Sequence, residues 1–249
     1  GKKDVMGVMG CKPIHVMKPE ERSAKLELSS FFIDTGLSKK QLEKIIDIGS
    51  PITRERELVE LGDLVNVKSL DNRVSVFVLL ETLRAIKKSR RKPAYDFYAA
   101  FTVQEEVGIR GANVSALDIQ PDFGFGLDTT IACDTPGTAP QDMVTKLGEG
   151  AGIKIMDSSA ICDYRMVKFM KKVATDKKIK WQPEILSAGG TDTAGLQRMV
   201  PGGSIAGAIS IPTRYIHQVI ETSHKKDIEN CIKLLTACVC ELDKGSWKF

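Results

Sequence analysis

The chain has few histidines, and its cysteines do not form the pairs that structural zinc sites use. Three histidines occur in 249 residues, at positions 15, 217 and 224. The six cysteines contain no CxxC pair with a second pair at zinc-finger spacing, which argues against a zinc-finger protein. Cysteines in this arrangement are most simply those of a reduced, cytosolic protein, so we expect a cytoplasmic location.

Long apolar runs are missing as well. None is long enough to cross a bilayer, and we expect no membrane partner. The net charge is only +4, and the basic residues are scattered apart from the cluster KKSRRK at 87–92. This cluster follows a predicted helix, where cations stabilise the C-terminal carbonyls, and that role is favoured over a nucleic-acid groove. We therefore expect no nucleic-acid partner.

What the chain does contain is typical of a globular protein, with 42% hydrophobic and 27% charged residues. Residues 1–56 hold short β-like pieces at Val5–Val8 and Phe31–Asp34, several turn residues, and a helix predicted over Ser38–Ile46 with Ser38 as its cap. This pattern predicts part of a small β-rich module. Residues 57–249 form the second predicted domain.

In the second domain strands and helices alternate, which predicts an α/β sheet with helices on both faces. Within the helix beginning at Asp71, the residues Val76, Leu79, Leu80, Leu83 and Ile86 recur at helical spacing, and Val74, Phe77 and Val78 widen this apolar face. The predicted elements are, in order, the strand Leu64–Leu70, the helix of residues 71–88, the strand Phe97–Val103, the short helix Gly111–Leu117, a strand ending at Asp128, the helix Tyr164–Thr175, the strand Gln182–Leu186, the strand Ile205–Ile211 and the helix Lys225–Leu242.

Several predicted strands end at residues of the types that bind metals. These are Asp71, Glu105, Glu106, Asp128 and His217. In open α/β sheets ligands bind beyond the carboxyl ends of the strands, so these side chains are expected at one rim. Carboxylates brought together without a cation would repel one another or take up protons. A divalent metal removes that conflict, and oxygen ligands with one imidazole suit zinc, cobalt or manganese.

Each of these residues also has an ordinary explanation. The Glu105-Glu106 pair is compatible with a solvated loop, and Asp71 with a helix N-cap. Asp128 could cap a turn, and His217 could be a hydrogen-bonded histidine near a helix start. Four strand-end coincidences in one chain are harder to explain separately, and together they favour the metal site.

The motifs around these residues resemble one family. GVMGCKPIHVMKPEER, FIDTG, SLDNR, QEEVGIRGA, GLDTT, GGTDT and IPTRYIH follow one another as they do in the TET-type metallo-aminopeptidases, which include the glutamyl and deblocking enzymes. The resemblance covers essentially the whole chain. It implies a mixed-sheet metallopeptidase domain at 57–249. Residues 1–56 would be the C-terminal part of an inserted, PDZ-like dimerisation domain.

The resemblance also implies roles for the rim residues. Asp71 would bridge two divalent ions, zinc or cobalt or else manganese, with Glu106 and His217 completing one site and Asp128 serving the other. Glu105 would be the general base that takes a proton from a metal-bound water, the nucleophile that attacks the N-terminal peptide bond. Two adjacent residues of a strand point to opposite faces, so seating both glutamates at one site predicts a turn or an unusual peptide there, and near Asp71-Asn72 as well.

The implied function is an aminopeptidase that releases N-terminal residues from short peptides. Self-association through the inserted domain would give a homo-oligomer, the tetrahedral dodecamer of the family. The GGTDT loop lies near the active site in the family, which makes Thr191 and Asp192 substrate-adjacent candidates. A tight turn before a helix, with Asp192 as its cap, is the alternative.

One departure keeps other interpretations open. The family has a further ligand, a histidine in an HxD motif on a segment before the inserted domain, and the chain contains no HxD. We expect that an N-terminal segment carrying this histidine precedes the given residues. If the histidine is absent from the protein, the chain is a non-catalytic assembly or peptide-binding subunit. Hydrolysis of another type of amide is the remaining alternative.

Overall fold

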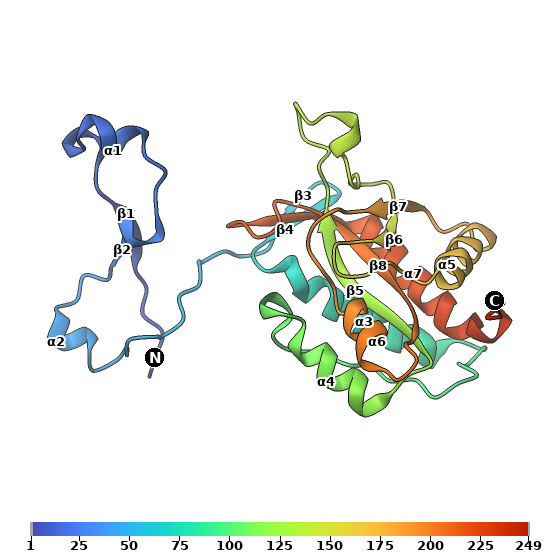
Figure 1. Ribbon diagram of the computed structural model, residues 1–249. Helices are drawn as coiled ribbons and strands as arrows, with labels where there is room; N and C mark the ends of the chain where they lie inside the picture. Colours follow the sequence, from blue (N-terminus) through green and yellow to red (C-terminus); the bar gives the residue numbers. More distant parts are fainter. Residues whose placement is uncertain (1, 249) are drawn as a thin grey trace. The chain divides into compact units, whose positions relative to one another are not determined.

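A computed structural model describes residues 2–248 of the protein (Figure 1). The chain separates into two compact units, one ending at Arg54 and the other beginning at Glu55. Within the described residues no helix is both long and apolar enough to span a membrane.

The first unit is built around a two-stranded antiparallel sheet. Strand β1 (Val8–Cys11) pairs with β2 (Phe31–Asp34), Val8 lying opposite Asp34. Helix α1 (Pro19–Ser23) lies between these strands in the sequence. Helix α2 (Lys39–Leu42) begins after Ser38, whose hydroxyl accepts a hydrogen bond from the amide of Gln41, so the predicted cap is confirmed although the helix is shorter than expected. The first strand lies three residues later than the predicted Val5–Val8.

The second unit is a mixed α/β domain. Its sheet has seven strands in the order β3-β4-β9-β8-β6-β7, with β5 pairing with β8. The elements are β3 (Val59–Leu61), β4 (Leu64–Val67), α3 (Leu70–Lys88), α4 (Arg110–Ile119), β5 (Phe123–Ile131), β6 (Ala151–Met156), α5 (Tyr164–Asp176), β7 (Trp181–Ile185), α6 (Thr193–Met199), β8 (Ile205–Arg214), β9 (Glu221–His224) and α7 (Lys225–Glu241).

Strand β8 organises the sheet because it is long enough to pair with three neighbours. It runs parallel to β5 along its whole length, antiparallel to β6 at its centre, and antiparallel to β9 near its end. The parallel and antiparallel pairs make the sheet mixed, as predicted. The polar residues that follow β8 and begin β9 therefore lie close to the end of β4, which pairs with β9 on its other side.

Helices cover both faces of this sheet, as Figure 1 shows. Helices α3, α5 and α7 pack together on one face, and α4 and α6 on the other. A Cβ added at Gly207 would lie 2.8 Å from Met166 of α5, whereas one at Gly126 would lie 2.1 Å from the hydroxyl of Thr193 in α6. Glycine at these two positions lets a helix approach the sheet on either side.

The two faces of the sheet differ in chemistry. On the α5 side the strands contribute apolar side chains such as Ile153, Ile209 and Ile211, which form the core with α3, α5 and α7. Side chains alternate between the two faces of a sheet, so Asp128 and Thr130 of β5 lie on the other face. The residues of β8 that pair with them lie there as well. The α6 side of the sheet is therefore the polar side, on which the buried charges described below lie.

Of two expectations about apolar segments, one was wrong and the other was correct only in part. The segment predicted as the strand Phe97–Val103 has no strand structure, and Phe97, Tyr98, Phe101 and Val103 are exposed. A strand needs a neighbour that supplies its ladder, and within residues 2–248 β5 pairs with β8 alone. Alternating apolar residues were therefore not sufficient.

The apolar face of α3 was predicted correctly only in part. Val74, Val78 and Ile86 are buried as expected, together with Leu70, Ser75 and Thr82. Val76, Phe77 and Leu80 are exposed, contrary to the prediction. The helix has apolar residues on nearly every side, so the pattern fits more than one face. The buried face also includes Thr82, which a search for apolar residues does not find.

The remaining predictions in this unit agree better. Helix α5 ends one residue beyond its predicted end, and α7 ends one residue earlier than predicted while burying Ile228, Cys231, Leu235 and Cys238. Strand β5 does not end at Asp128 but continues to Ile131, and β8 continues to Arg214. Strands β3, β6 and β9 were not predicted, and helix α6 was considered only as the helix that would follow a tight turn at GGTDT.

Candidate metal centre

Asp71 lies at the junction between β4 and α3. Its backbone is not helical (φ −76°, ψ 107°), and the peptide bond between Asp71 and Asn72 is cis. The residue before α3 is Ser69, and no side chain caps this end of the helix, so the N-cap role considered for Asp71 is not observed. The Asp71 carboxylate instead faces His217, with 3.0 Å between Oδ2 and Nε2.

Glu105 and Glu106 open a short 3₁₀ turn, Glu105–Val107, after Gln104 in the left-handed region (φ 59°). The expected turn is therefore present at the glutamate pair. The Glu106 carboxylate lies 3.4 Å from Nε2 of His217. Burial raises the pKa of Glu105 to about 7, and the negative charges of Asp192, Glu106 and Asp71 add to the increase.

His217 lies in the loop between β8 and β9, with a positive φ of 61°. One ligand atom from each of Asp71, Glu106 and His217 lies within 4.8 Å of the other two. This distance is small enough for a single ion to contact all three groups. Three of the five residues expected at the rim are thus brought together, from α3, the turn before α4, and the loop after β8.

Asp128 is a buried neighbour of this group rather than part of it. It lies within β5, and its carboxylate accepts a hydrogen bond of 2.8 Å from the amide of Thr129. Its pKa is raised well above the usual range, first by burial and then by the negative charges of Asp71 and Glu105. Asp128 is therefore close enough to the three-residue group to interact with it electrostatically.

The GGTDT loop contributes one of its two candidate residues to this acidic region. Asp192 raises the pKa of Glu105, and its own pKa is raised by burial. It accepts a hydrogen bond of 2.5 Å from the Thr102 hydroxyl, while its Oδ1 is buried without a partner among the described residues. The Asp192 side chain does not cap α6. Thr191 donates to Asp157 at 3.3 Å, so its hydroxyl is engaged on the interior side.

Sequence reasoning missed a second charged cluster, which lies under the polar face of the sheet. Lys154 of β6 forms ion pairs with Glu184 of β7 and, at 3.6 Å, with Asp157, and all three side chains are almost completely buried. The Thr130 hydroxyl donates to Glu184 at 2.6 Å. Burial alone would lower the pKa of Lys154, but the charge of Glu184 and its hydrogen bond raise it. We call these three residues the Lys154 cluster.

Glu221 was also missed, although it lies four residues after His217. It is the first residue of β9 and is 3% exposed. Its Oε2 accepts a hydrogen bond of 2.8 Å from the amide of Asp71, and its Oε1 one of 3.3 Å from the amide of His217. A glutamate at the start of a β-strand gives no sign of such a position in the sequence.

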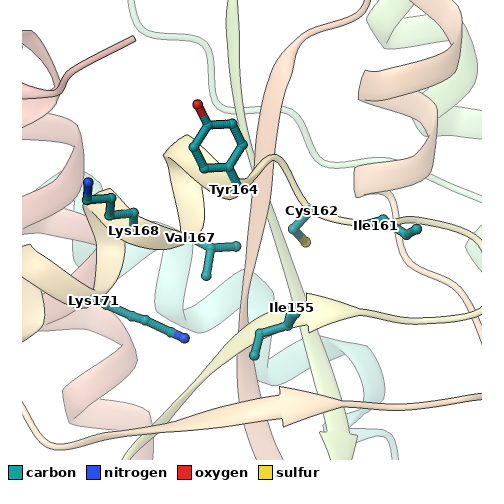
Figure 2. Close-up of a pocket in the computed structure, with 7 residues that line it drawn as sticks. All are labelled: Ile155, Ile161, Cys162, Tyr164, Val167, Lys168 and Lys171. Carbon is teal, nitrogen blue, oxygen red and sulfur yellow. The ribbon is translucent and has the colours of Figure 1, made fainter. Parts of the chain in front are cut away.

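A separate hollow of about 450 Å³ lies between α5 and β6 (Figure 2). Apolar side chains such as Ile155 and Val167 line it, and the amines of Lys168 and Lys171 are its charged groups. Without a carboxylate in its lining, it does not have the chemistry of a cation site.

Comparisons with known proteins agree with this arrangement. A profile described as M42 glutamyl aminopeptidase matches residues 1–234. The chain belongs to the M42 glutamyl aminopeptidase family. Peptidases of this family depend on metal ions.

Solved structures of the same group have the same fold. The TET aminopeptidase of a marine sediment Thaumarchaeota archaeon is 33% identical with a TM-score of 0.90, over 96% of this chain and 67% of that one. An aminopeptidase of Desulfurococcus kamchatkensis is 38% identical with a TM-score of 0.87, over 94% and 64%. The TET1 peptidase of Pyrococcus horikoshii is 29% identical with a TM-score of 0.77, over 94% and 68%. The chain spans 60% to 68% of the length of curated relatives it matches.

The residues of the centre fit a divalent cation. Two carboxylates and one imidazole converge on one point, and the pKa of Asp71 is raised by burial and by the charge of Glu106. A bound cation would reverse that unfavourable interaction. Oxygen and nitrogen donors without a thiolate are the set used by zinc, cobalt and manganese.

Proposed function

We propose that this chain carries the catalytic centre of a metal-dependent aminopeptidase that releases N-terminal residues from peptides. The observation that carries the proposal is the convergence of Asp71, Glu106 and His217 within 4.8 Å, with Glu105 as the residue before one of them. Membership of the M42 family supports the same activity.

In this proposal the centre holds two divalent ions, zinc or cobalt or else manganese. Asp71, Glu106 and His217 would hold one, and Asp71 and Asp128 the other. Bound there, the ions would lower the pKa of a water molecule and polarise the carbonyl oxygen of the substrate. Asp128 is suited to its role because a buried carboxylate beside other carboxylates gains most from a cation.

Glu105 would act as the general base. It is half-buried and next to Glu106, and three other carboxylates, Asp192, Glu106 and Asp71, are the charges that most strongly favour its protonated form. It can therefore take a proton from the attacking water and later return it to the leaving amine, the transfer that cleavage of a peptide bond requires. Asp192, and with it Thr191, would border the substrate.

We also propose a cytoplasmic homo-oligomer. The Pyrococcus horikoshii peptidase is described as assembling into a tetrahedron or a large octahedral shell, and another related structure as a dodecamer. Residues 1–56 would provide the contacts, as part of an inserted PDZ-like domain. The separate β1–β2 unit supports this division of the chain.

The deciding experiment compares Glu105→Gln with Glu106→Gln. Both variants are loaded with Zn²⁺ or Co²⁺ and assayed on aminoacyl p-nitroanilides and on the N-acetylated forms of the same substrates. We expect Glu105→Gln to lose about 10²- to 10⁴-fold in kcat while keeping its metal, and Glu106→Gln to lose metal as well. Glu149→Gln, at an exposed carboxylate paired with Lys180, is the control and should keep full activity.

Two outcomes would contradict the proposal. Equal turnover of acetylated and free substrates would indicate hydrolysis of another amide. A metal-loaded chain without turnover on any substrate would indicate a non-catalytic subunit.

A further inference from the structure

We infer that Glu221 is a positioning residue that holds Asp71 and His217 in the geometry needed to bind metal. This inference rests on the proposed function, because it assumes that these two side chains are ligands. Glu221 itself is not a ligand in this inference. Its carboxylate is engaged with the backbone of the two ligand residues rather than with their side chains.

The fold explains how one side chain reaches both ligand residues. Strand β9 lies between β4 and β8, and Glu221 is its first residue, paired with Val67 at the last position of β4. Beyond Val67 the chain leads into Asp71, and beyond the end of β8 it leads into His217. A residue at the start of the middle strand therefore lies beside both segments as they leave the sheet.

Both segments need an acceptor at this point. Asp71 is the second residue of α3, and the first four amides of a helix have no acceptor within the helix. His217 has a positive φ of 61°, a region that a non-glycine residue occupies when its surroundings hold it there. Each oxygen of Glu221 accepts one of these two amide hydrogens, and a charged acceptor makes the stronger kind of hydrogen bond.

Glu221 is in turn fixed by its own strand. The side-chain amide of Asn66 donates to the Glu221 carbonyl at 3.1 Å and to the Thr222 hydroxyl at 2.7 Å. Glu221 is 3% exposed and Asn66 is also 3% exposed. The backbone from which the Glu221 carboxylate extends is therefore held in place, and partners of this kind restrict the orientation of metal ligands.

The test uses Co²⁺ binding to the 249-residue chain, followed by visible absorption, for the unsubstituted protein and for Glu221→Gln. Glutamine has the same shape but only one acceptor oxygen, so one of the two amide hydrogen bonds is lost while the fold is kept. We expect the Kd for Co²⁺ to rise about 10- to 100-fold.

Asp227 offers a matched control. It is fully buried in the same unit, and its carboxylate also accepts two backbone amides, from Gly148 at 2.7 Å and from Gly150 at 2.8 Å, but neither of these residues is a ligand. Asp227→Asn therefore removes an equivalent interaction and one negative charge. We expect its Kd for Co²⁺ to change by less than about twofold, a difference that a general loss of stability would not produce.

Amide hydrogen exchange without metal separates positioning from a loss of charge. In Glu221→Gln at least one of the amides of Asp71 and His217 should exchange faster, and in Asp227→Asn at least one of those of Gly148 and Gly150. The inference is wrong if Glu221→Gln binds Co²⁺ like the unsubstituted chain, or if Asp227→Asn weakens binding equally. If the unsubstituted chain binds no Co²⁺, the proposed function fails as well.

Discussion

The second unit contains two clusters of acidic residues that differ in how their negative charge is balanced. In the Lys154 cluster two buried carboxylates surround a lysine, and every charge has a partner of opposite sign. At the candidate metal centre the charges acting most strongly on Asp71, Glu105 and Asp128 are those of other carboxylates, with His217 as the basic partner.

The difference indicates where an external cation is needed. A buried carboxylate without a cation is costly, so the protein supplies Lys154 where the acidic cluster is structural. At the candidate metal centre this free-energy cost is not offset. It is seen in the raised pKa values of Asp71, Glu105 and Asp128. An acidic cluster that lacks an internal cation is thus a better sign of a binding site than an acidic cluster alone.

Replacing the internal cation should have the largest effect on stability. Lys154→Met leaves Glu184 and Asp157 buried without a cation, and we expect the free energy of unfolding to fall by about 3–5 kcal/mol, measured by urea denaturation. Lys172→Met is the control, because Lys172 pairs with Asp176 on the surface, and its effect should be within about 0.5 kcal/mol. A loss below about 1 kcal/mol in Lys154→Met would show that the cluster does not depend on its lysine.

Replacing a carboxylate of the candidate metal centre should not lower the stability of the metal-free chain. Asp71→Asn removes a charge that burial and Glu106 disfavour, so the metal-free variant should be at least as stable as the unsubstituted chain. Zn²⁺ at 100 times its Kd should stabilise the unsubstituted chain by about 2.7 kcal/mol and the variant much less, in thermal unfolding. Equal stabilisation of both proteins would remove Asp71 from the site.

The smallest effect should come from pH. In the folded, metal-free chain the pKa of Glu105 is about 7, above the unfolded value of about 4.3, so between these values the folded state holds a proton that the unfolded state has lost. This contribution is present at low pH and is lost as the pH rises through about 7.

We therefore expect the Tm of the chelator-treated chain to fall by a few degrees between pH 5 and pH 7.5, since about 1 kcal/mol corresponds to 2–4 °C at this size. Glu105→Gln should reduce the slope, and bound metal should abolish it. A Tm that rises over this interval would contradict the assignment.

Much of the fold could be predicted because helices α5 and α7 have a single apolar face. The edge of the sheet could not be predicted. Apolar and polar residues alternate around Phe101 as they do in a strand, but the structure gives this segment no partner strand. Strand formation depends on a neighbour that local sequence does not specify. Strand β9 was missed for a related reason: its four residues, ETSH, look polar, yet Thr222 and Ser223 are buried between β4 and β8.

The convergence of Asp71, Glu106 and His217 could be predicted, because each of them follows a recognisable strand or motif. The positions of Glu221 and Lys154 could not be predicted, because they depend on contacts across about 30 to 150 positions of sequence. Asp128 shows an intermediate case: the sequence placed it near the rim, while the structure places it inside β5 and next to the three-residue group.

The packing of α7 has a consequence for thiol chemistry. Cys231, Cys238 and Cys240 are buried in or beside its apolar face, and Cys162 is buried nearby under α5. Burial raises the pKa of Cys162 to about 12 and that of Cys231 and Cys238 further above the usual range. Alkylating reagents need the thiolate, so at neutral pH they will react with Cys231 and Cys238 only when α7 leaves the sheet. The rate at which these two thiols are labelled therefore measures how fast the second unit opens.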